Sequence, residues 1–404
     1  MEVIGVAAEF NPFHKGHARL LRESRRAAGG DAAVVCVMSG CFVQRGEPAI
    51  LAPHARGEMA VRAGADLVLE LPVPWALASA EGFARGAVGL LAGLGVVTRL
   101  SFGSESGDLP GLEALAEALL EPGFSAALAG RPRAGGESYA AARQALLEQR
   151  IGPAARTLEG PNNILAVEYL KALRRLKSPI RPMTVLRAGA AHDAPVPKSG
   201  REEAPWSASA LRAGIRSGAD IRSGLPEACR EILERERALG RGPADPERLE
   251  TALLSRLRCL PERAFAALPD AGEGLENRLF RAARQGAGLE EVLAAAKTKG
   301  YALARLRRMC WGAGVGLTRA LGEGAPPYAR VLAANARGRV LLRRIEAAAT
   351  VPVITKPAEV RTLDGSCAGV FQAEAAAWDL WALGCPGTAW RAGGGIWRQS
   401  PVMV

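Results

Sequence analysis

The sequence predicts an α/β fold, in which a Rossmann-like parallel sheet is followed by a mostly α-helical C-terminal region. Over the first 190 residues, short apolar runs alternate with helical patterns, as in proteins whose helices connect parallel strands and cover both faces of the sheet. Beyond about residue 225 the patterns are mostly helical. Because 404 residues exceed what one core usually covers, we expect two domains, over 1–220 and 221–404.

Five apolar runs of strand length make up the predicted sheet. They cover residues 3–8, 32–38, 67–71, 99–102 and 183–186. The runs 3–8 and 32–38 are apolar throughout, as expected for strands that are buried on both faces. Since ligands of such sheets bind at the carboxyl ends of the strands, we expect the functional site in the loops that follow residues 8, 38, 71 and 102.

Helical spacing connects these strands and dominates the rest of the chain. The first helix is expected to end at Gly29 and Gly30, and a polar loop rich in Pro and Gly at 188–206 is a predicted boundary. The predicted helices cover 16–28, 53–63, 79–93, 162–176, a stretch from 207 onwards, 246–259, 275–284 and 289–309.

The composition excludes several classes of protein. No window of about 18 apolar residues lacks a charge, so we expect no membrane span and no membrane partner. Glu2, Glu9 and Glu23 interrupt the region where a secretory leader would need an apolar core, and we expect a cytoplasmic location. The seven cysteines form no Cys-x-x-Cys pair, which predicts reduced core thiols and no metal site.

The chain is basic, with 52 Lys and Arg against 41 Asp and Glu. Residues 301–404 carry 13 basic and 6 acidic side chains, which favours a polyanionic partner such as RNA. The 45 arginines against 7 lysines also suit a GC-rich coding bias, in which case these side chains form ordinary solvated faces. The candidate RNA contacts on basic helix faces are Arg305, Arg307, Arg308, Arg337, Arg339, Arg343 and Arg344.

The segment from Glu9 to His17 carries the most chemical information. His14 and His17 bracket Gly16 directly after the first predicted strand, where a helix begins. Free N–H groups and a partial positive charge make a helix start suitable for phosphate. Gly16 allows the backbone to approach a ligand closely. Two imidazoles three residues apart can both donate to one phosphate and stabilise a transition state with added negative charge.

Several motifs in order along the chain resemble one family. They are ExNPFHxGH at 9–17, MSGCFVQRGEP at 38–48, DLVLELP at 66–72, FGSE at 102–105, PNNIL at 161–165, SASALR at 207–212 and TKGY at 298–301. The set resembles the bacterial tRNA(Met) cytidine acetate ligase family, within the HxGH nucleotidyltransferase superfamily, over most of residues 3–350.

The resemblance implies an ATP-dependent ligase that activates acetate as acetyl-adenylate. The exocyclic amine of the wobble cytidine of elongator tRNA(Met) would then attack the acyl carbon. Residues 1–220 would form the ATP-binding nucleotidyltransferase domain, and 221–404 would bind tRNA. The implied cofactors are ATP and Mg²⁺, and the implied catalytic residues are His14 and His17. The implied ATP-binding residues are Ala7, Ala8, Glu9, Phe10, Asn11, Pro12, Phe13, His14, Lys15, Gly16, His17, Ala18, Arg19, Leu20, Gly103, Asn162 and Arg187.

Other polar residues have two interpretations each. Arg45 lies on the ligand edge and would bind phosphate or the tRNA backbone, or pair with Glu47. Ser209 and Arg212 would approach the phosphates or belong to a capped surface helix.

Three acidic residues lie within or directly before predicted elements, and their roles are also open. Glu70 and Glu81 would be buried partners of arginines or catalytic groups, and Asp66 a turn or cap residue. Two other function classes stay open on the residues alone. One is a small-molecule adenylyl- or cytidylyltransferase, and the other is a non-catalytic RNA-binding factor.

Overall fold

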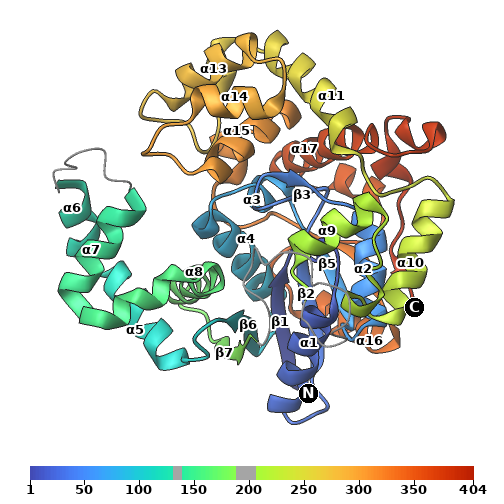
Figure 1. Cartoon of the computed structure of the whole chain (residues 1–404). Coiled ribbons are helices and arrows are strands. Elements are labelled where there is room, and N and C mark those ends of the chain that lie inside the picture. The colour runs from blue at the N-terminus through green and yellow to red at the C-terminus, as the bar shows by residue number, and fades with distance from the viewer. Residues whose placement is uncertain (131–138, 188–205) are drawn as a thin grey trace.

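In the computed structural model, which describes residues 1–130, 139–187 and 206–404, the main sheet has eight strands. Its strand order is β10-β8-β5-β2-β1-β6-β7, and β9 pairs with β8 (Figure 1). The strands are β1 (Val3–Ala8), β2 (Ala33–Ser39), β5 (Leu67–Leu71), β6 (Arg99–Ser104), β7 (Arg181–Leu186), β8 (Ala329–Ala334), β9 (Val353–Ile354) and β10 (Val402–Met403).

The five predicted strands are confirmed, and they form one parallel block. In the centre of this block, Val6 of β1 pairs with Cys36 of β2 on one side and with Ser101 of β6 on the other. β5 and β7 extend the block in parallel at its two sides. The carboxyl ends of these strands therefore share one edge, as the predicted site requires.

The remaining strands come from the C-terminal part and were not predicted. β8 runs antiparallel to β5, with Leu67 opposite Ala334, so the sheet is mixed rather than parallel throughout. β9 and β10 then pair in parallel with β8. The β8 sequence is short and rich in alanine, which has a low strand propensity, so no strand pattern stands out. The sheet therefore draws strands from both predicted domains, 1–220 and 221–404, whose boundary stays a prediction.

Helices cover both faces of the sheet, as predicted, because alternate strand residues feed two apolar layers. Close packing is visible at Gly5 of β1, where a β-carbon would lie 2.9 Å from Leu91 of the covering helix. One layer contains α1 (Lys15–Ala27), α2 (Pro53–Arg62), α9 (Ala208–Ser217) and α10 (Glu227–Ala238). The other contains α4 (Ala80–Gly93), α8 (Pro161–Arg175) and α16 (Ala336–Ala348).

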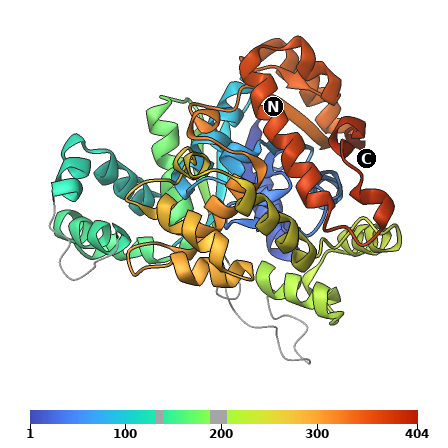
Figure 2. The ribbon, with the colours of Figure 1, turned by 90° about the horizontal axis from the view of Figure 1, so that it is seen from above.

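The C-terminal part also contributes a group of helices beyond the carboxyl edge of the sheet (Figures 1 and 2). The prediction of one helix over 289–309 is wrong, because the chain forms two helices there. Lys297 has an extended conformation and the chain turns before Leu303. The group contains α11 (Pro246–Cys259), α12 (Glu262–Ala266), α13 (Leu275–Gln285), α14 (Leu289–Ala296) and α15 (Leu303–Val315), with α17 (Gly365–Ala382) beside it.

A helical insertion between β6 and β7 has no counterpart among the predicted elements. It forms the projection at the left of Figure 1 and leads into α8. The insertion contains α5 (Leu109–Leu120), α6 (Pro122–Gly130), α7 (Tyr139–Ile151) and a 3-10 helix over Gly152–Glu159. The predicted boundary loop at 188–206 lies outside the described residues, apart from its last position.

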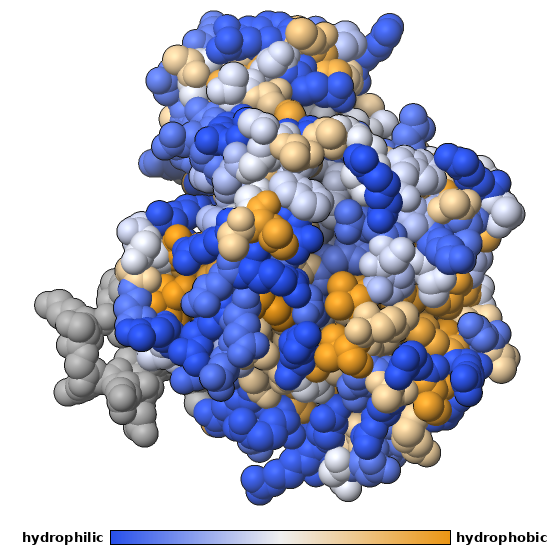
Figure 3. All heavy atoms as spheres, turned by 90° about the vertical axis from the view of Figure 1, so that its right-hand side faces the viewer, coloured by the Kyte–Doolittle hydropathy of each residue, from blue (hydrophilic) through white to orange (hydrophobic). Residues whose placement is uncertain are grey.

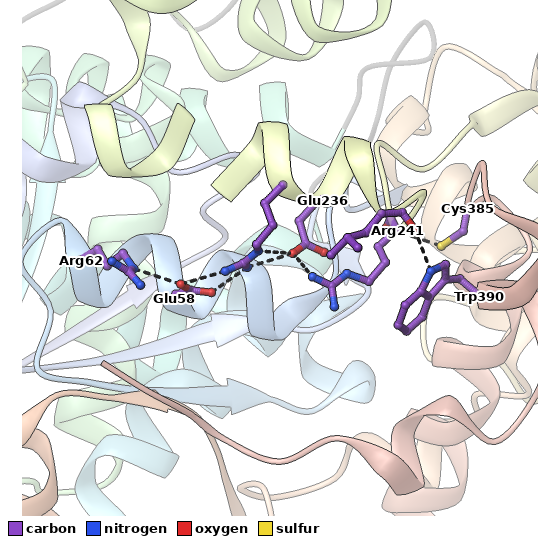
Figure 4. A network of polar contacts seen from close by, with 8 residues as sticks. Glu58, Arg62, Glu236, Arg241, Cys385 and Trp390 are labelled. Carbon is purple, nitrogen blue, oxygen red and sulfur yellow. Dashed lines mark hydrogen bonds and ion pairs between the residues drawn. The ribbon is translucent and has the colours of Figure 1, made fainter. Parts of the chain in front are cut away.

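A charged network ties the N-terminal and C-terminal parts together (Figure 4). Glu58 of α2, 3% exposed, pairs with Arg62 at 3.0 Å and with Arg235 of α10 at 2.7 Å. Arg235 also pairs with Glu236 at 2.9 Å, and Glu236 pairs with Arg241 at 2.6 Å. Burial alone would raise the pKa of Glu58, but its two arginines lower it. The network fixes α10 against α2.

A second, fully buried polar cluster confirms Glu70 as the partner of an arginine. Its carboxylate pairs with Arg330 of β8, and both side chains are 2% exposed. Glu374 of α17 accepts the Val73 N–H next to them. Burial, and then the charge of Glu70, raise the pKa of Glu374 well above its ordinary value. Gly40 is required beside them, because a β-carbon there would lie 2.5 Å from Glu70 Oε1.

The other two acidic residues also have structural roles. Glu81 pairs with Arg175 and, at 3.7 Å, with Lys171 on α8. Asp66 is 4% exposed and accepts hydrogen bonds from Arg25 at 2.7 Å and from the Val34 N–H at 2.8 Å. Asp66 therefore joins α1 to β2 by buried bonds, which is a different structural role from the predicted turn or cap.

All seven cysteines, which lie within the described residues, are free, and the prediction of core thiols is confirmed for the six that are buried but is wrong for Cys259, which is exposed. In the ranges 1–130, 139–187 and 206–404, none of the helices combines the length and the apolar character needed to cross a bilayer.

His54, which is 6% exposed beside the Glu70–Arg330 cluster, gives a testable pH dependence. Burial, and then the charge of Arg330, lower its pKa to about 3. The unfolded chain, with an ordinary histidine pKa of about 6.5, takes up the proton first. The free energy of unfolding should therefore fall as the pH drops from about 6.5 towards 3, by up to about 1.4 kcal/mol per pH unit from this group.

Urea unfolding of the wild type and the His54→Gln variant at pH 7 and pH 4.5 would measure this effect. The wild type should lose more stability between the two pH values than the variant. Only in the wild type does folding require a protonated histidine at position 54 to give up its proton. Equal losses in the two proteins would contradict the expectation.

Candidate active site

A pocket of about 370 Å³ lies at the carboxyl edge of the parallel block, where the sequence predicts the site. Its wall is built from the loop after β1, the start of α1, the ends of β6 and β7, and the starts of α8 and α9. The short hairpin of β3 (Phe42–Val43) and β4 (Glu47–Pro48) completes it. The volume is within the range of pockets that bind small molecules.

His14 and His17 are fixed by the start of α1. The Gly16 N–H donates to His14 Nδ1 at 3.0 Å, and the His14 N–H donates to His17 Nδ1 at 3.2 Å. The two rings stack with their centroids 3.7 Å apart, and both line the pocket. Because each Nδ1 accepts a backbone hydrogen bond, the hydrogen of each ring in its neutral form lies on Nε2.

The electrostatics keep His17 neutral. Burial, followed by the nearby His14 and Arg187, lowers the pKa of His17 well below 6.5. Phe13 supports this ring from the core, with the ring centroids 5.5 Å apart. A neutral donor that is already oriented can stabilise charge without reorganising during a reaction.

Gly16 has a second reason to be glycine besides the predicted close approach to a ligand. A β-carbon at this position would lie 2.8 Å from Cε1 of His14, so a larger residue would displace the imidazole.

Most of the residues implied by the family resemblance meet in this pocket. Four do not line it, namely Pro12, Phe13, Lys15 and Ala18, of which Lys15 is exposed. The residues that do are Ala7, Ala8, Glu9, Phe10, Asn11, His14, Gly16, His17, Arg19, Leu20, Gly103, Asn162 and Arg187.

Asn162 and Arg187 form a second polar unit of the pocket wall. Arg187 Nη1 donates to Asn162 Oδ1 at 3.0 Å. Glu105 in turn accepts the Asn162 N–H at 3.1 Å and the Asn163 N–H at 2.8 Å. Glu105 was not predicted as a site residue, although its position directly after β6 could have indicated it. Glu105 orients the start of α8 toward the pocket.

The β3–β4 hairpin brings Gln44, Arg45 and Glu47 to the pocket wall. Glu47 pairs with Arg212 of α9 at 3.1 Å and with Arg307 of α15 at 3.7 Å. Arg212 also lines the pocket, so it belongs to the site rather than to an exposed helix surface. Ser209, three positions before Arg212, does not line the pocket.

The Arg56 side chain connects the loops of the site through hydrogen bonds to their backbone carbonyls. The side chain is fully buried and donates to Glu9 O at 2.6 Å, Ser39 O at 2.9 Å and Leu51 O at 3.0 Å, and also to Gly40 O. Burial lowers its pKa to about 10, so it stays charged at neutral pH. One guanidinium therefore fixes the ends of both β1 and β2.

The predicted basic residues form two separate faces. Those on α15 lie beside the hairpin at the carboxyl edge, where a β-carbon on Gly46 would lie 2.6 Å from Arg308 N. They are largely paired, as Arg308 is with Asp270 at 2.9 Å. The helix α16 instead starts at the amino edge, because Ala334 pairs with Leu67 there. The exposed arginines on α16 are Arg339, Arg343 and Arg344.

The side of the molecule that bears α10 and α16 mixes hydrophilic side chains with hydrophobic groups across its middle (Figure 3). Hydrophilic side chains therefore do not form a continuous surface on this side.

Comparison with known proteins identifies the family. A model described as HIGH Nucleotidyl Transferase matches residues 1–388. The tRNA(Met) cytidine acetate ligase of Acetivibrio thermocellus is 35% identical over 420 residues and aligns with 100% of both chains. That of Syntrophomonas wolfei is 36% identical over 420 residues, covering 100% of this chain and 99% of the relative. The chain belongs to the tRNA(Met) cytidine acetate ligase family.

Solved structures of this ligase family have the same fold. TmcAL of Thermotoga maritima, in its apo form I, has a TM-score of 0.93 at 32% identity over 100% of both chains. The same protein bound with alpha-thio ATP has a TM-score of 0.91 at the same identity and coverage. The motif resemblance is confirmed and extends beyond residues 3–350 to the whole chain. The predicted fold class is confirmed as well.

The aromatic wall of the pocket in this ligase family member was not predicted. Phe83 of α4, Phe102 of β6 and Tyr169 of α8 are each at most 5% exposed and line the cavity beside Glu9. Helical spacing explains Phe83 and Tyr169 equally well as core residues, and Phe102 lies in a buried strand, so the sequence carries no signal that separates the two roles.

Proposed function

We propose that this chain is an ATP-dependent ligase that makes acetyl-adenylate and acetylates the exocyclic amine of the wobble cytidine of elongator tRNA(Met). The observation that carries the proposal is the stacked pair of His14 and His17, whose Nδ1 atoms both accept backbone N–H groups at the start of α1 and whose rings line the pocket. The full-length match to ligases with this name supports the choice among nucleotidyltransferase reactions.

In the first step, an acetate oxygen attacks the α-phosphorus of ATP and pyrophosphate leaves. The Nε2–H groups of His14 and His17 would donate to phosphoryl oxygens, where negative charge grows in the transition state. Arg187, which donates a hydrogen bond to Asn162, adds a cation to the pocket wall. The protein supplies no covalent nucleophile, because orientation and charge stabilisation are sufficient for this substitution.

Mg²⁺ belongs to the proposal as an ion that arrives with ATP. The described part of the chain has no group of three or more His, Cys, Asp or Glu side chains that could hold a metal. In nucleotide sites Mg²⁺ keeps several waters and binds substrate phosphates with one or two protein carboxylates at most. The residues present therefore fit an ion held mainly by the triphosphate, where it would neutralise phosphate charge.

For the tRNA, we propose that phosphates bind the exposed arginines Arg339, Arg343 and Arg344 and the basic side of α15. Such contacts give affinity that falls steeply with salt and carry little sequence information. A cytoplasmic location is also part of the proposal, since the tRNA substrate is there. Residues 221–404 would supply most of this RNA-binding surface.

Incubation with ATP, Mg²⁺ and labelled acetate tests the function directly. We expect label in elongator tRNA(Met) and none in the same transcript with uridine at the wobble position, because uridine lacks the exocyclic amine. Pyrophosphate release with label in a small molecule would instead identify a small-molecule adenylyl- or cytidylyltransferase. Absence of ATP binding would identify a non-catalytic RNA-binding factor.

A further inference from the structure

Glu9 lies on the pocket wall directly after β1, and hydrogen bonds fix both its backbone oxygen and its side-chain carboxylate. Its backbone oxygen accepts from Arg56 Nη1 at 2.6 Å. Its side-chain Oε1 accepts the Gln44 N–H from the β3–β4 hairpin at 2.7 Å. The carboxylate is therefore held in one orientation, with its second oxygen available to a bound molecule.

The two carboxylates of the pocket differ in how they are neutralised. Glu47 forms ion pairs with Arg212 at 3.1 Å and with Arg307 at 3.7 Å. Glu9 forms no ion pair with any Lys or Arg in the ranges that the structure describes. Glu9 is therefore the carboxylate of this wall that can accept a proton or a hydrogen bond without breaking a salt bridge.

Three aromatic side chains line the same pocket as Glu9. Phe102 and Tyr169 pack with ring centroids 5.8 Å apart, and Phe83 lines the same part of the cavity. Burial, and then the negative charge of Glu9, raise the pKa of Tyr169, which places the phenol near the carboxylate. A flat ring that carries an amino group suits such a site, with its face on the aromatic wall and its amine on Glu9.

We propose that Glu9 accepts a hydrogen bond from the exocyclic amine of the acceptor cytidine and takes its proton during acetyl transfer. Carboxylates are the side chains that accept from this amine of cytosine. The assignment rests on the proposed function, and it gives Glu9 a role toward the RNA rather than toward ATP.

In the proposed step, the acetyl group moves from AMP to the amine of the cytidine. The amine lone pair forms the nitrogen–carbon bond, and the carbonyl π electrons move to oxygen. The carbonyl re-forms as the bond from the acyl carbon to the AMP oxygen breaks, so that AMP leaves with that electron pair. The amine proton moves to the Glu9 carboxylate, which later releases it to water.

The surroundings of Glu9 favour this role. Burial raises the pKa of the Glu9 carboxyl, although the Gln44 N–H, Arg45 and Arg212 oppose the shift. A carboxylate with a raised pKa is a stronger base than an exposed one, and catalytic bases are commonly tuned in this way.

The test compares two reactions of the Glu9→Gln variant, which keeps the size of the side chain and an acceptor for the Gln44 N–H. Acetate-dependent ATP–pyrophosphate exchange measures adenylate formation, and single-turnover transfer to tRNA measures the second step. We expect transfer to fall by about 10²–10⁴-fold, the usual contribution of a general base, with a much smaller loss of exchange. The rise of the wild-type transfer rate with pH across the Glu9 titration should disappear.

Glu47→Gln is the matched control, because it changes the same charge in the same pocket. It should keep the rise of the transfer rate with pH. Glu9→Asp should transfer faster than Glu9→Gln, since it retains a carboxylate, whereas a purely structural role would make the shorter side chain no better.

Three outcomes would overturn the assignment. Equal losses of exchange and transfer in Glu9→Gln would place Glu9 in the ATP half of the reaction. An unchanged transfer rate and pH profile would remove Glu9 from the chemistry. A wild-type protein that exchanges pyrophosphate but never acetylates tRNA would overturn the proposed function and this assignment together.

Discussion

Replacing His14 and His17 together by alanine should reduce acetate-dependent ATP–pyrophosphate exchange by at least about 10²–10³-fold, the usual cost of losing one oriented donor. Each imidazole uses Nδ1 to accept a backbone N–H of the α1 start, and both rings line the pocket, where we propose that they donate to phosphate. The two losses should be far from additive, because the stacked rings act as one unit. Exchange kinetics at saturating ATP and acetate measure the effect.

Arg22→Ala is the control, since Arg22 is exposed on the same helix with 68% of its side chain accessible. It should retain the exchange rate of the wild type. His17→Gln separates chemistry from folding, because glutamine still offers an acceptor to the His14 N–H. Full activity in the double alanine variant would show that the histidines serve only to cap the helix.

Replacing Arg330 by methionine should destabilise the protein by about 3–5 kcal/mol, which is the cost of leaving a buried charge without its partner. Glu70 and Arg330 are each 2% exposed, and Glu374 beside them already holds a raised pKa. Urea unfolding at pH 7 measures the change in the free energy of unfolding.

The double variant Arg330→Met with Glu70→Gln should recover more than half of that loss, because no unpaired charge is then buried. A single variant that loses less than about 1 kcal/mol, the value typical of an exposed pair, would contradict the account. So would a double variant that is less stable than the single one.

The sequence was sufficient for the parallel block and for the position of the site. Runs such as 3–8 and 32–38 are apolar throughout and are followed by polar loops, and this pattern has few interpretations besides a buried strand. His14, Gly16 and His17 follow such a run at the start of a helix, so their meeting at the carboxyl edge could be predicted from local order alone.

The features that sequence patterns missed depend on contacts between distant segments. Arg307 reaches Glu47 across 260 positions of chain, and Glu70 pairs with Arg330 at the same separation. Tyr169 faces the pocket from a helix whose spacing is satisfied by core packing alone. No local pattern distinguishes these side chains, because their roles are set by tertiary neighbours.

The position of β8 has a consequence for the order in which the protein is made. Until residue 334 has left the ribosome, β5 presents an unpaired, apolar backbone edge to its surroundings. Such an edge readily pairs with another chain. A nascent or truncated polypeptide that ends near residue 220 should therefore self-associate, and completion of the sheet is a late, post-translational event.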